Sequence, residues 1–132
     1  MAKTIYLMRH GRYDGQTRDG ILTPFGRGEI LTNGQQLRLE LGTLDQITIY
    51  HSQMRRAVES AQALAEALQP IRVELVPRSE LNCDSNDVKS VVQGIDAIGI
   101  LVSHMPELEH YTQEITGKPM RFKNAEYKRF DL

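Results

Sequence analysis

The sequence predicts an α/β fold, a three-layer sandwich in which a mostly parallel central sheet has helices on both faces. Short apolar runs rich in β-branched residues alternate with stretches of helical periodicity, which is typical of parallel strands joined by crossover helices. The 132 residues suit one domain, residues 1–132, because no internal repeat, low-complexity segment or long linker divides them.

Four strands are expected where apolar runs precede polar or small-residue turns: Thr4 to Met8, Ile47 to Tyr50, Arg72 to Val76 and Ala97 to Val102. The tail from Met120 to Phe130 has strand-like pieces around Asn124. We expect this tail to form an antiparallel edge strand at the C-terminal end of the chain.

Helical faces follow each of the four strands. Thr23 can cap the first helix, with Pro24 at its first position, and Gly42 ends it. The apolar positions of the other three helices are Ala57, Ala61, Leu64, Ala65 and Leu68; Val88, Val91, Val92 and Ile95; and Leu108, Tyr111 and Ile115, before Gly117.

Composition and charge exclude several classes of protein. The formal net charge is −1 and no Lys/Arg block is present, which argues against nucleic acid or an anionic membrane as partner. No apolar run has the length of a membrane span or a signal-peptide core, so we expect a cytoplasmic protein. The single cysteine, Cys83, excludes an internal disulfide framework, and we interpret it as a structural or incidental thiol.

Histidines and arginines follow three of the predicted strands. Arg9-His10-Gly11 ends the first, His51-Ser52 with Arg55-Arg56 follows the second, and Ser103-His104 ends the fourth. In parallel sheets, ligands bind beyond the carboxyl ends of the strands, so these segments are expected to converge. Guanidinium groups recognise phosphate oxygens in pairs of charge-assisted bonds, and a neutral imidazole is a competent nucleophile toward phosphorus. Phosphate is the favoured ligand.

Four motifs in this order resemble those of the histidine phosphatase superfamily, the phosphoglycerate-mutase-like group. They are Arg9-His10-Gly11, Leu22-Thr23-Pro24-Phe25-Gly26, Ser52-Gln53-Met54-Arg55-Arg56-Ala57 and Val102-Ser103-His104. The resemblance extends from Lys3 to about Gly117. It implies that His10 is a nucleophile that becomes phosphorylated, that Arg9, Arg56 and His104 form the phosphate pocket, and that no metal or organic cofactor takes part.

The second motif contains two neighbouring arginines. Arg56 is preferred because, like the family arginine, it lies directly before Ala and four residues after Ser52. Arg55 is expected to be an exposed charge that pairs with Glu59 at i+4. Ser52 either orients an arginine or caps the helix, and His51 and His110 are expected to be solvated. A metal site is disfavoured because the flanking arginines would repel a cation.

Departures from the family pattern narrow the subclass. Arg12 and Gln16 occupy the places where the mutases have glutamate and asparagine, although Gln16 can still donate a hydrogen bond to phosphate. Larger members insert a cap in the segment that corresponds to Pro77 to Asp96, which is short here. The pocket should therefore be open and suited to a phosphorylated side chain of another protein. In its compactness the chain resembles the small bacterial phosphohistidine phosphatases more than the sugar-phosphate mutases.

Alcohol leaving groups need a general acid, whereas an imidazole leaving group protonates readily by itself. Glu80 is the best candidate acid, ahead of Asp84 and Asp87, but each also fits a solvated or helix-capping carboxylate.

The leading hypothesis is a protein phosphohistidine phosphatase. The alternative enzyme is a small-metabolite phosphomonoesterase or a phosphoglycerate-mutase-like enzyme. From another class, a non-catalytic phosphate- or phosphoprotein-binding module is possible, although His10 and His104 together argue against it.

Overall fold

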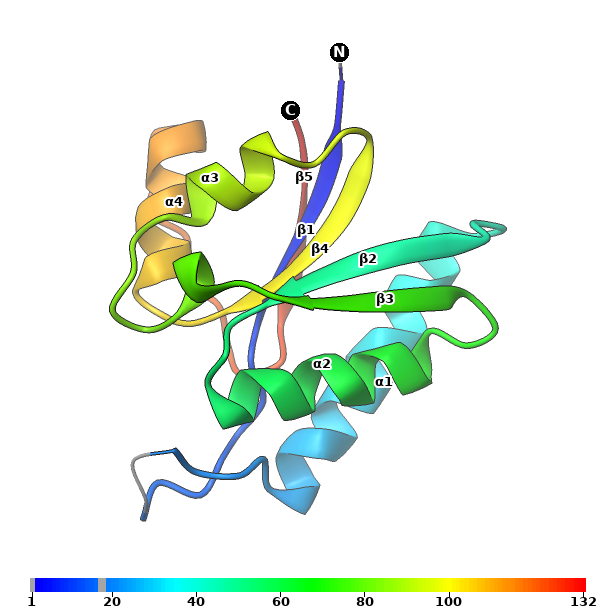
Figure 1. Cartoon of the computed structure of the whole chain (residues 1–132), viewed down its shortest axis with the longest axis vertical. Helices are drawn as coiled ribbons and strands as arrows, with labels where there is room; N and C mark the ends of the chain where they lie inside the picture. The colour runs from blue at the N-terminus through cyan, green and yellow to red at the C-terminus, as the bar shows by residue number, and fades with distance from the viewer. Residues whose placement is uncertain (1, 17–18) are drawn as a thin grey trace.

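The computed structural model describes residues 2–16 and 19–132, with a five-stranded sheet in the order β3-β2-β4-β1-β5 (Figure 1). Four strands are parallel to one another, and the fifth is antiparallel to β1. Their bounds are β1 Thr4–Arg9, β2 Gln46–His51, β3 Arg72–Pro77, β4 Ile98–Ser103 and β5 Tyr127–Asp131. The predicted parallel sheet with an antiparallel C-terminal edge strand is confirmed.

Helices cover both faces of the sheet, which confirms the three-layer architecture. Figure 1 shows α1 (Pro24–Leu41) and α2 (Arg55–Ala67) side by side on one face, and α3 (Val88–Gln93) and α4 (Glu107–Thr116) on the other. A 3-10 helix, Ser79–Leu81, precedes α3. No helix in the described part of the chain has the length and apolar character needed to cross a bilayer.

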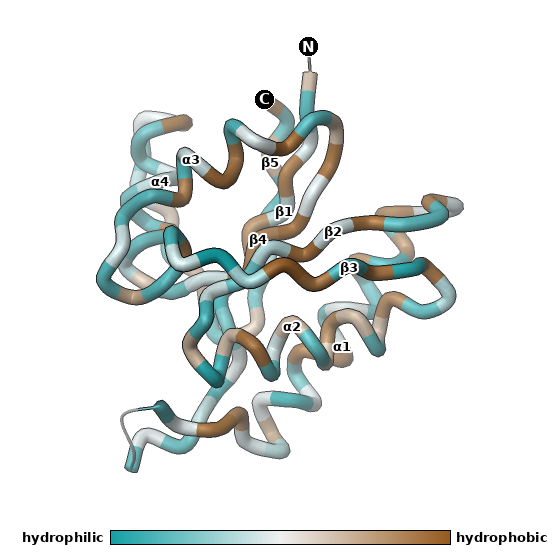
Figure 2. Tube along the Cα trace, in the orientation of Figure 1, coloured by the Kyte–Doolittle hydropathy of each residue, from teal (hydrophilic) through white to brown (hydrophobic). Residues whose placement is uncertain are grey.

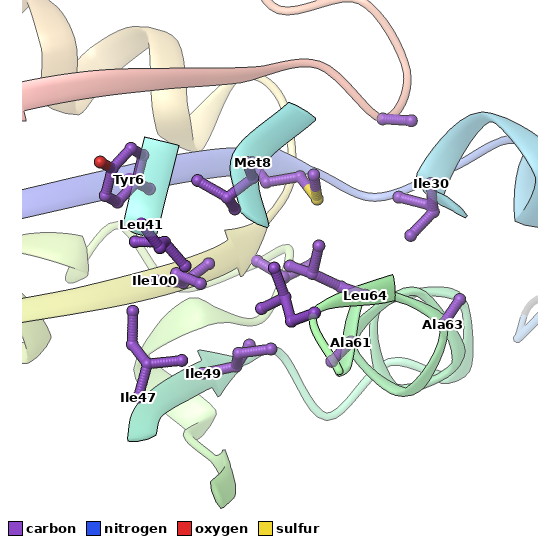
Figure 3. Close-up of a cluster of buried hydrophobic side chains, with 14 of the residues drawn as sticks. Tyr6, Met8, Ile30, Leu41, Ile47, Ile49, Ala61, Ala63, Leu64 and Ile100 are labelled. Carbon is purple, nitrogen blue, oxygen red and sulfur yellow. The ribbon is translucent and has the colours of Figure 1, made fainter. Parts of the chain in front are cut away.

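The alternation of side chains along β1 divides the core into two layers. Tyr6 and Met8 point toward α1 and α2, whereas Ile5 and Leu7 face α3 and α4. Figure 3 shows the first layer, in which Leu64 of α2 lies among side chains from the strands. Figure 2 shows apolar stretches along β1 and β4, among others, and both faces of these two strands are buried.

The first helix begins and ends where the sequence indicates. The Oγ1 of Thr23 accepts a hydrogen bond from the backbone N–H of Gly26 at 3.0 Å, and Pro24 occupies the first turn. Gly42 ends the helix with a φ of 62°, a conformation that a residue without Cβ adopts at little cost.

The tail differs from the prediction in one part. β5 begins only at Tyr127, so the expectation of strand structure around Asn124 is wrong. Ala125 has a φ of 66°, and its backbone N–H lies 3.1 Å from the carbonyl oxygens of both Arg9 and His10. The chain therefore turns at Ala125, beside the end of β1, before β5 pairs with that strand. A turn at this position cannot have extended backbone.

The strand order decides where the site forms. β4 lies between β1 and β2, and all three run in the same direction, so their carboxyl ends share one edge of the sheet. Arg9 lies opposite Ser103, and His51 lies opposite Val102. Consequently His10, Ser52 and His104, each at the end of its strand, are neighbours in space.

Gly34 and Gly28 on α1 provide a matched test of the packing. A Cβ on Gly34 would lie 2.6 Å from the Cβ of Ala67, so Gly34→Ala should destabilise the protein by about 1–3 kcal/mol through overpacking. A Cβ on the exposed Gly28 meets no atom within 4 Å, and Gly28→Ala should stabilise the protein by about 0.5–1 kcal/mol through helix propensity. Urea unfolding measures both changes, and equal stability of the two variants would contradict the close approach of α1 and α2.

Candidate active site

His10 lies at the carboxyl end of β1 and is almost completely buried, with 4% of its surface exposed. Its backbone N–H donates to the carbonyl of Ser103 at 3.1 Å, which extends the β1–β4 pairing by one residue. Its Nδ1 lies 2.8 Å from the carbonyl oxygen of Gly11. Because a carbonyl oxygen only accepts, Nδ1 carries the proton and Nε2 has a free lone pair.

The surroundings keep the His10 ring neutral. Burial, the largest cause, together with the positive charges of Arg56 and Arg9, lowers its pKa to about 4, against the opposing effect of the hydrogen bond to Gly11. At neutral pH the imidazole is therefore unprotonated at Nε2, which is the form that acts as a nucleophile.

His104 faces His10 from the end of β4, with the ring centroids 5.0 Å apart. Its Nε2 lies 2.7 Å from the Oγ of Ser52, and that hydroxyl donates to the side-chain oxygen of Asn82 at 3.2 Å. Since the serine proton goes to Asn82, the neutral ring of His104 donates through Nε2–H and keeps its lone pair on Nδ1. Burial and then the charges nearby lower the pKa of His104 to about 3.

Arg9 and Arg56 bring positive charge to the same place. Arg56 is 8% exposed, and the Nε atoms of both arginines are buried without a hydrogen-bond partner. Arg9 donates through Nη1 to the carbonyl of Phe122 at 2.9 Å. Within residues 2–16 and 19–132, no carboxylate lies within ion-pair distance of either guanidinium. Two charges that are not neutralised beside two neutral histidines favour an anion.

Two contacts of Arg56 were missed by the sequence analysis. The Cζ of Arg56 lies 4.3 Å from the ring centroid of Tyr13, and its Nη2 donates to the Sγ of Cys83 at 3.0 Å. The same sulfur lies 3.5 Å from Nδ1 of His104. Of the two interpretations of Cys83, a structural or an incidental thiol, these contacts favour the structural one. A signal was present, because Tyr13 and Cys83 both follow strands at the carboxyl edge of the sheet.

Ser52 and Gln16, the two further candidates for phosphate contact, differ in position. Ser52 is fully buried and contacts His104; its Oγ also accepts from the backbone N–H of Met54, the residue that precedes α2. Gln16 is exposed on the loop, and its backbone N–H donates to Asp14 at 3.0 Å. The structure thus brings together His10, His104, Arg9, Arg56 and Ser52, while the described contacts of Gln16 lie within its own loop.

The three candidate acids lie outside this cluster of buried groups. Glu80 accepts from Nε of Arg78 at 3.1 Å, and this hydrogen bond is the main reason that its pKa falls to about 2. Asp84 and Asp87 are exposed, and Asp87 accepts from the hydroxyl of Ser90 at the start of α3. A carboxylate that is ionised at neutral pH has no proton to donate.

The predictions for Arg55 and His51, outside the proposed phosphate site, had different outcomes. Arg55 pairs with Glu59 at 3.3 Å on the exposed side of α2, as the i+4 spacing predicts. His51 is 4% exposed, with its Nδ1–H bonded to the carbonyl of Ser52, so the expectation that it is solvated is wrong. His51 is the last residue of β2, which lies between β3 and β4 in the sheet.

Solved structures with the same fold include a protein from Agrobacterium tumefaciens assigned as the phosphohistidine phosphatase SixA, with a TM-score of 0.78 and 19% identity over 98% of this chain and 91% of that chain. A protein histidine phosphatase SixA in complex with tungstate gives 0.75 and 20% over 96% and 86%. A phosphoglycerate mutase from Plasmodium falciparum gives 0.67 and 20% over 91% and 72%. These likenesses establish a shared fold. A search of curated proteins gave no significant match.

A match to a family model shows family membership in addition to the shared fold. The model of the histidine phosphatase superfamily (branch 1) matches residues 5–82, which is more than half of the chain and includes Arg9, His10 and Arg56. The chain therefore belongs to branch 1 of the histidine phosphatase superfamily and is a hydrolase of the phosphatase type.

Proposed function

We propose that this enzyme is a protein phosphohistidine phosphatase that works through a covalent phosphohistidine intermediate on His10. The observation that carries the proposal is the state of His10: Nδ1–H is bonded to the carbonyl of Gly11, the ring is neutral, and Nε2 is free beside Arg9 and Arg56. A phosphoryl group with a charge of about −1.5 to −2 at neutral pH matches these two guanidinium groups.

In the first step, Nε2 of His10 attacks phosphorus. The Nε2–P bond forms, the bond from phosphorus to the substrate nitrogen breaks, and its electron pair leaves with the substrate imidazole. The ring of His10 becomes positively charged, and the hydrogen bond from Nδ1–H to Gly11 strengthens as that charge develops. Arg9 and Arg56 supply donors for the phosphoryl oxygens in the transition state, and the ring of His104 lies beside that of His10.

In the second step, water attacks the phosphorus of the intermediate. The oxygen–phosphorus bond forms, the Nε2–P bond breaks, and the electron pair returns to His10 while the water proton leaves with phosphate or solvent. The arginines hold the phosphoryl group during both steps, so one pocket serves both. Neutral His10 is then regenerated, which its low pKa favours.

Two features support phosphohistidine over an alkyl phosphate as substrate. The segment between β3 and β4 contains a 3-10 helix and the six-residue α3, so it holds no large cap that would exclude a side chain presented by another protein. The candidate acid Glu80 is held ionised by Arg78. An imidazole leaving group needs no strong acid. Of the structural neighbours, one is assigned as a phosphohistidine phosphatase and another is described as a protein histidine phosphatase.

Replacement of the nucleophile tests the covalent step. His10→Ala should lower turnover by about four orders of magnitude or more, because no other group can form the intermediate. Trapping with labelled phosphohistidine peptide should place phosphate on His10 in an acid-labile, alkali-stable linkage. The exposed His110 is the control, and His110→Ala should keep its activity. Wild-type turnover in the His10→Ala variant would refute the mechanism.

The adjacent arginines of α2 are expected to behave differently. Arg56→Ala removes charge-assisted hydrogen bonds to the phosphoryl group, each worth about 1.5–3 kcal/mol, and should lower kcat/KM about 10- to 200-fold. Arg55→Ala removes an exposed pair with Glu59 and should change kcat/KM less than about 2-fold. Steady-state kinetics on both variants measure these changes. A larger loss in Arg55→Ala than in Arg56→Ala would show that Arg55 is the arginine that binds phosphate.

Glu80→Gln distinguishes the substrate classes. For a phosphohistidine phosphatase, the change should alter turnover of a phosphohistidine peptide less than about 3-fold, and the wild type should be slow on alkyl phosphates. A positioned general acid would contribute about 10²- to 10⁴-fold on an alkyl phosphate. Rapid wild-type hydrolysis of alkyl phosphates, with a loss of that size in Glu80→Gln, would replace the phosphohistidine assignment with a metabolite phosphatase and leave the role of His10 unchanged.

A further inference from the structure

The guanidinium group of Arg56 is held in place without a carboxylate partner among the described residues. A guanidinium group is usually held in place by a carboxylate, but a carboxylate would neutralise the charge that phosphate requires. Among the described residues Arg56 has no such partner, and its Nε is buried without a hydrogen bond. Some other contact must hold the group.

We propose that Tyr13 and Cys83 are positioning residues that hold the Arg56 guanidinium in the oxyanion site without neutralising its charge. The ring centroid of Tyr13 lies 4.3 Å from Cζ of Arg56, and Sγ of Cys83 accepts from Nη2 at 3.0 Å. One contact restricts the plane of the guanidinium and the other restricts its rotation within that plane. The proposal rests on the proposed function only in naming the phosphoryl group as the natural oxyanion.

Tyr13 is fixed by the loop that carries it. Tyr13 forms an isolated antiparallel bridge with Leu22, and the backbone N–H of Asp14 donates to the carbonyl of Ile21 at 2.8 Å. The end of the loop that precedes α1 is bound to α2, because the N–H of Leu22 donates to the carboxylate of Glu59 at 2.8 Å. The ring therefore contacts Arg56 from a backbone that is anchored to the same helix as Arg56.

Gly20 makes this close pairing possible. A Cβ at position 20 would lie 1.7 Å from the carbonyl oxygen of Asp14 and 3.0 Å from the ring of Tyr13. Tyr13 also contacts His10 edge-on, with the centroids 5.4 Å apart and the planes at 72°. One ring thus contacts both the nucleophile and the arginine that flanks it.

Cys83 is a neutral partner for the arginine. Burial raises the pKa of its thiol despite the nearby charge of Arg56, so at neutral pH the sulfur offers lone pairs and no negative charge. The sulfur also lies 3.5 Å from Nδ1 of His104. This nitrogen carries no proton, because the ring donates to Ser52 through Nε2–H. Because the Ser52 contact already orients His104, Cys83 acts on orientation through its contact with Arg56.

Oxyanion affinity tests this without requiring turnover. The Kd for orthovanadate should rise about 3- to 30-fold in Tyr13→Leu, the range expected for a lost cation–π contact, and by a smaller factor in Cys83→Ala. Tyr13→Phe and Cys83→Ser keep an aromatic ring and a small acceptor, and should restore most of the affinity. Phe25→Leu is the matched control, because Phe25 stacks on Arg12 at 5.1 Å, outside the cluster of buried site residues, and should leave the Kd unchanged.

A double-mutant cycle with Arg56→Ala shows whether the two residues act through Arg56. Tyr13→Leu and Cys83→Ala should each have less than about a 2-fold effect in the Arg56→Ala background. Equal effects in both backgrounds would overturn the proposal, as would a loss of affinity in Tyr13→Phe equal to that in Tyr13→Leu. If the wild type binds vanadate with this coupling between Arg56 and the two positioning residues but hydrolyses no substrate, the proposed phosphatase function is refuted and the positioning role of Tyr13 and Cys83 stands. A wild type that binds no vanadate would overturn both.

Discussion

The parallel pairing of β4 with both β1 and β2 is the constraint on which the rest of the site depends. It extends past the strands, since the backbone N–H groups of His10 and Ser52 donate to carbonyls of β4 at 3.1 Å each. These bonds hold the first residue after each strand in a fixed register. Side chains from positions 10, 52 and 104 are thereby brought into contact by backbone geometry, before any side-chain interaction is considered.

The chemistry of the site follows from burial of these groups together. Two guanidinium charges and two imidazoles are packed at one edge of the sheet. Burial disfavours the protonated form of each imidazole, and the nearby arginines would also repel it, so the pKa values of His10 and His104 are low. Buried guanidinium charges without an ionic partner are destabilising, and in the proposed function a phosphoryl group supplies the missing negative charge. The large core on both faces of the sheet offsets that local cost.

Neutral partners have a particular advantage in such a site. An aromatic face and a thiol orient the Arg56 guanidinium and leave its charge free for the ligand, whereas Arg78 and Glu80 illustrate the alternative, in which each group satisfies the other. This agrees with the proposed phosphohistidine substrate, whose leaving group needs little help from an acid.

Much of the fold and the centre of the site could be predicted from the sequence, because both depend on local signals. Strand and helix periodicity, Thr23 with Pro24, and Gly42 all act within a few residues of one another, and the strand-end motifs identified His10, Arg56 and His104. The tail around Asn124 was predicted wrongly, because its turn follows from hydrogen bonds to the distant end of β1. The burial of His51 and the contacts of Tyr13 and Cys83 with Arg56 were likewise decided only by the tertiary structure. The physical reason is that cation–π and sulfur contacts depend on distances of a few ångströms between segments far apart in the chain, and such distances leave no periodic signal in the sequence.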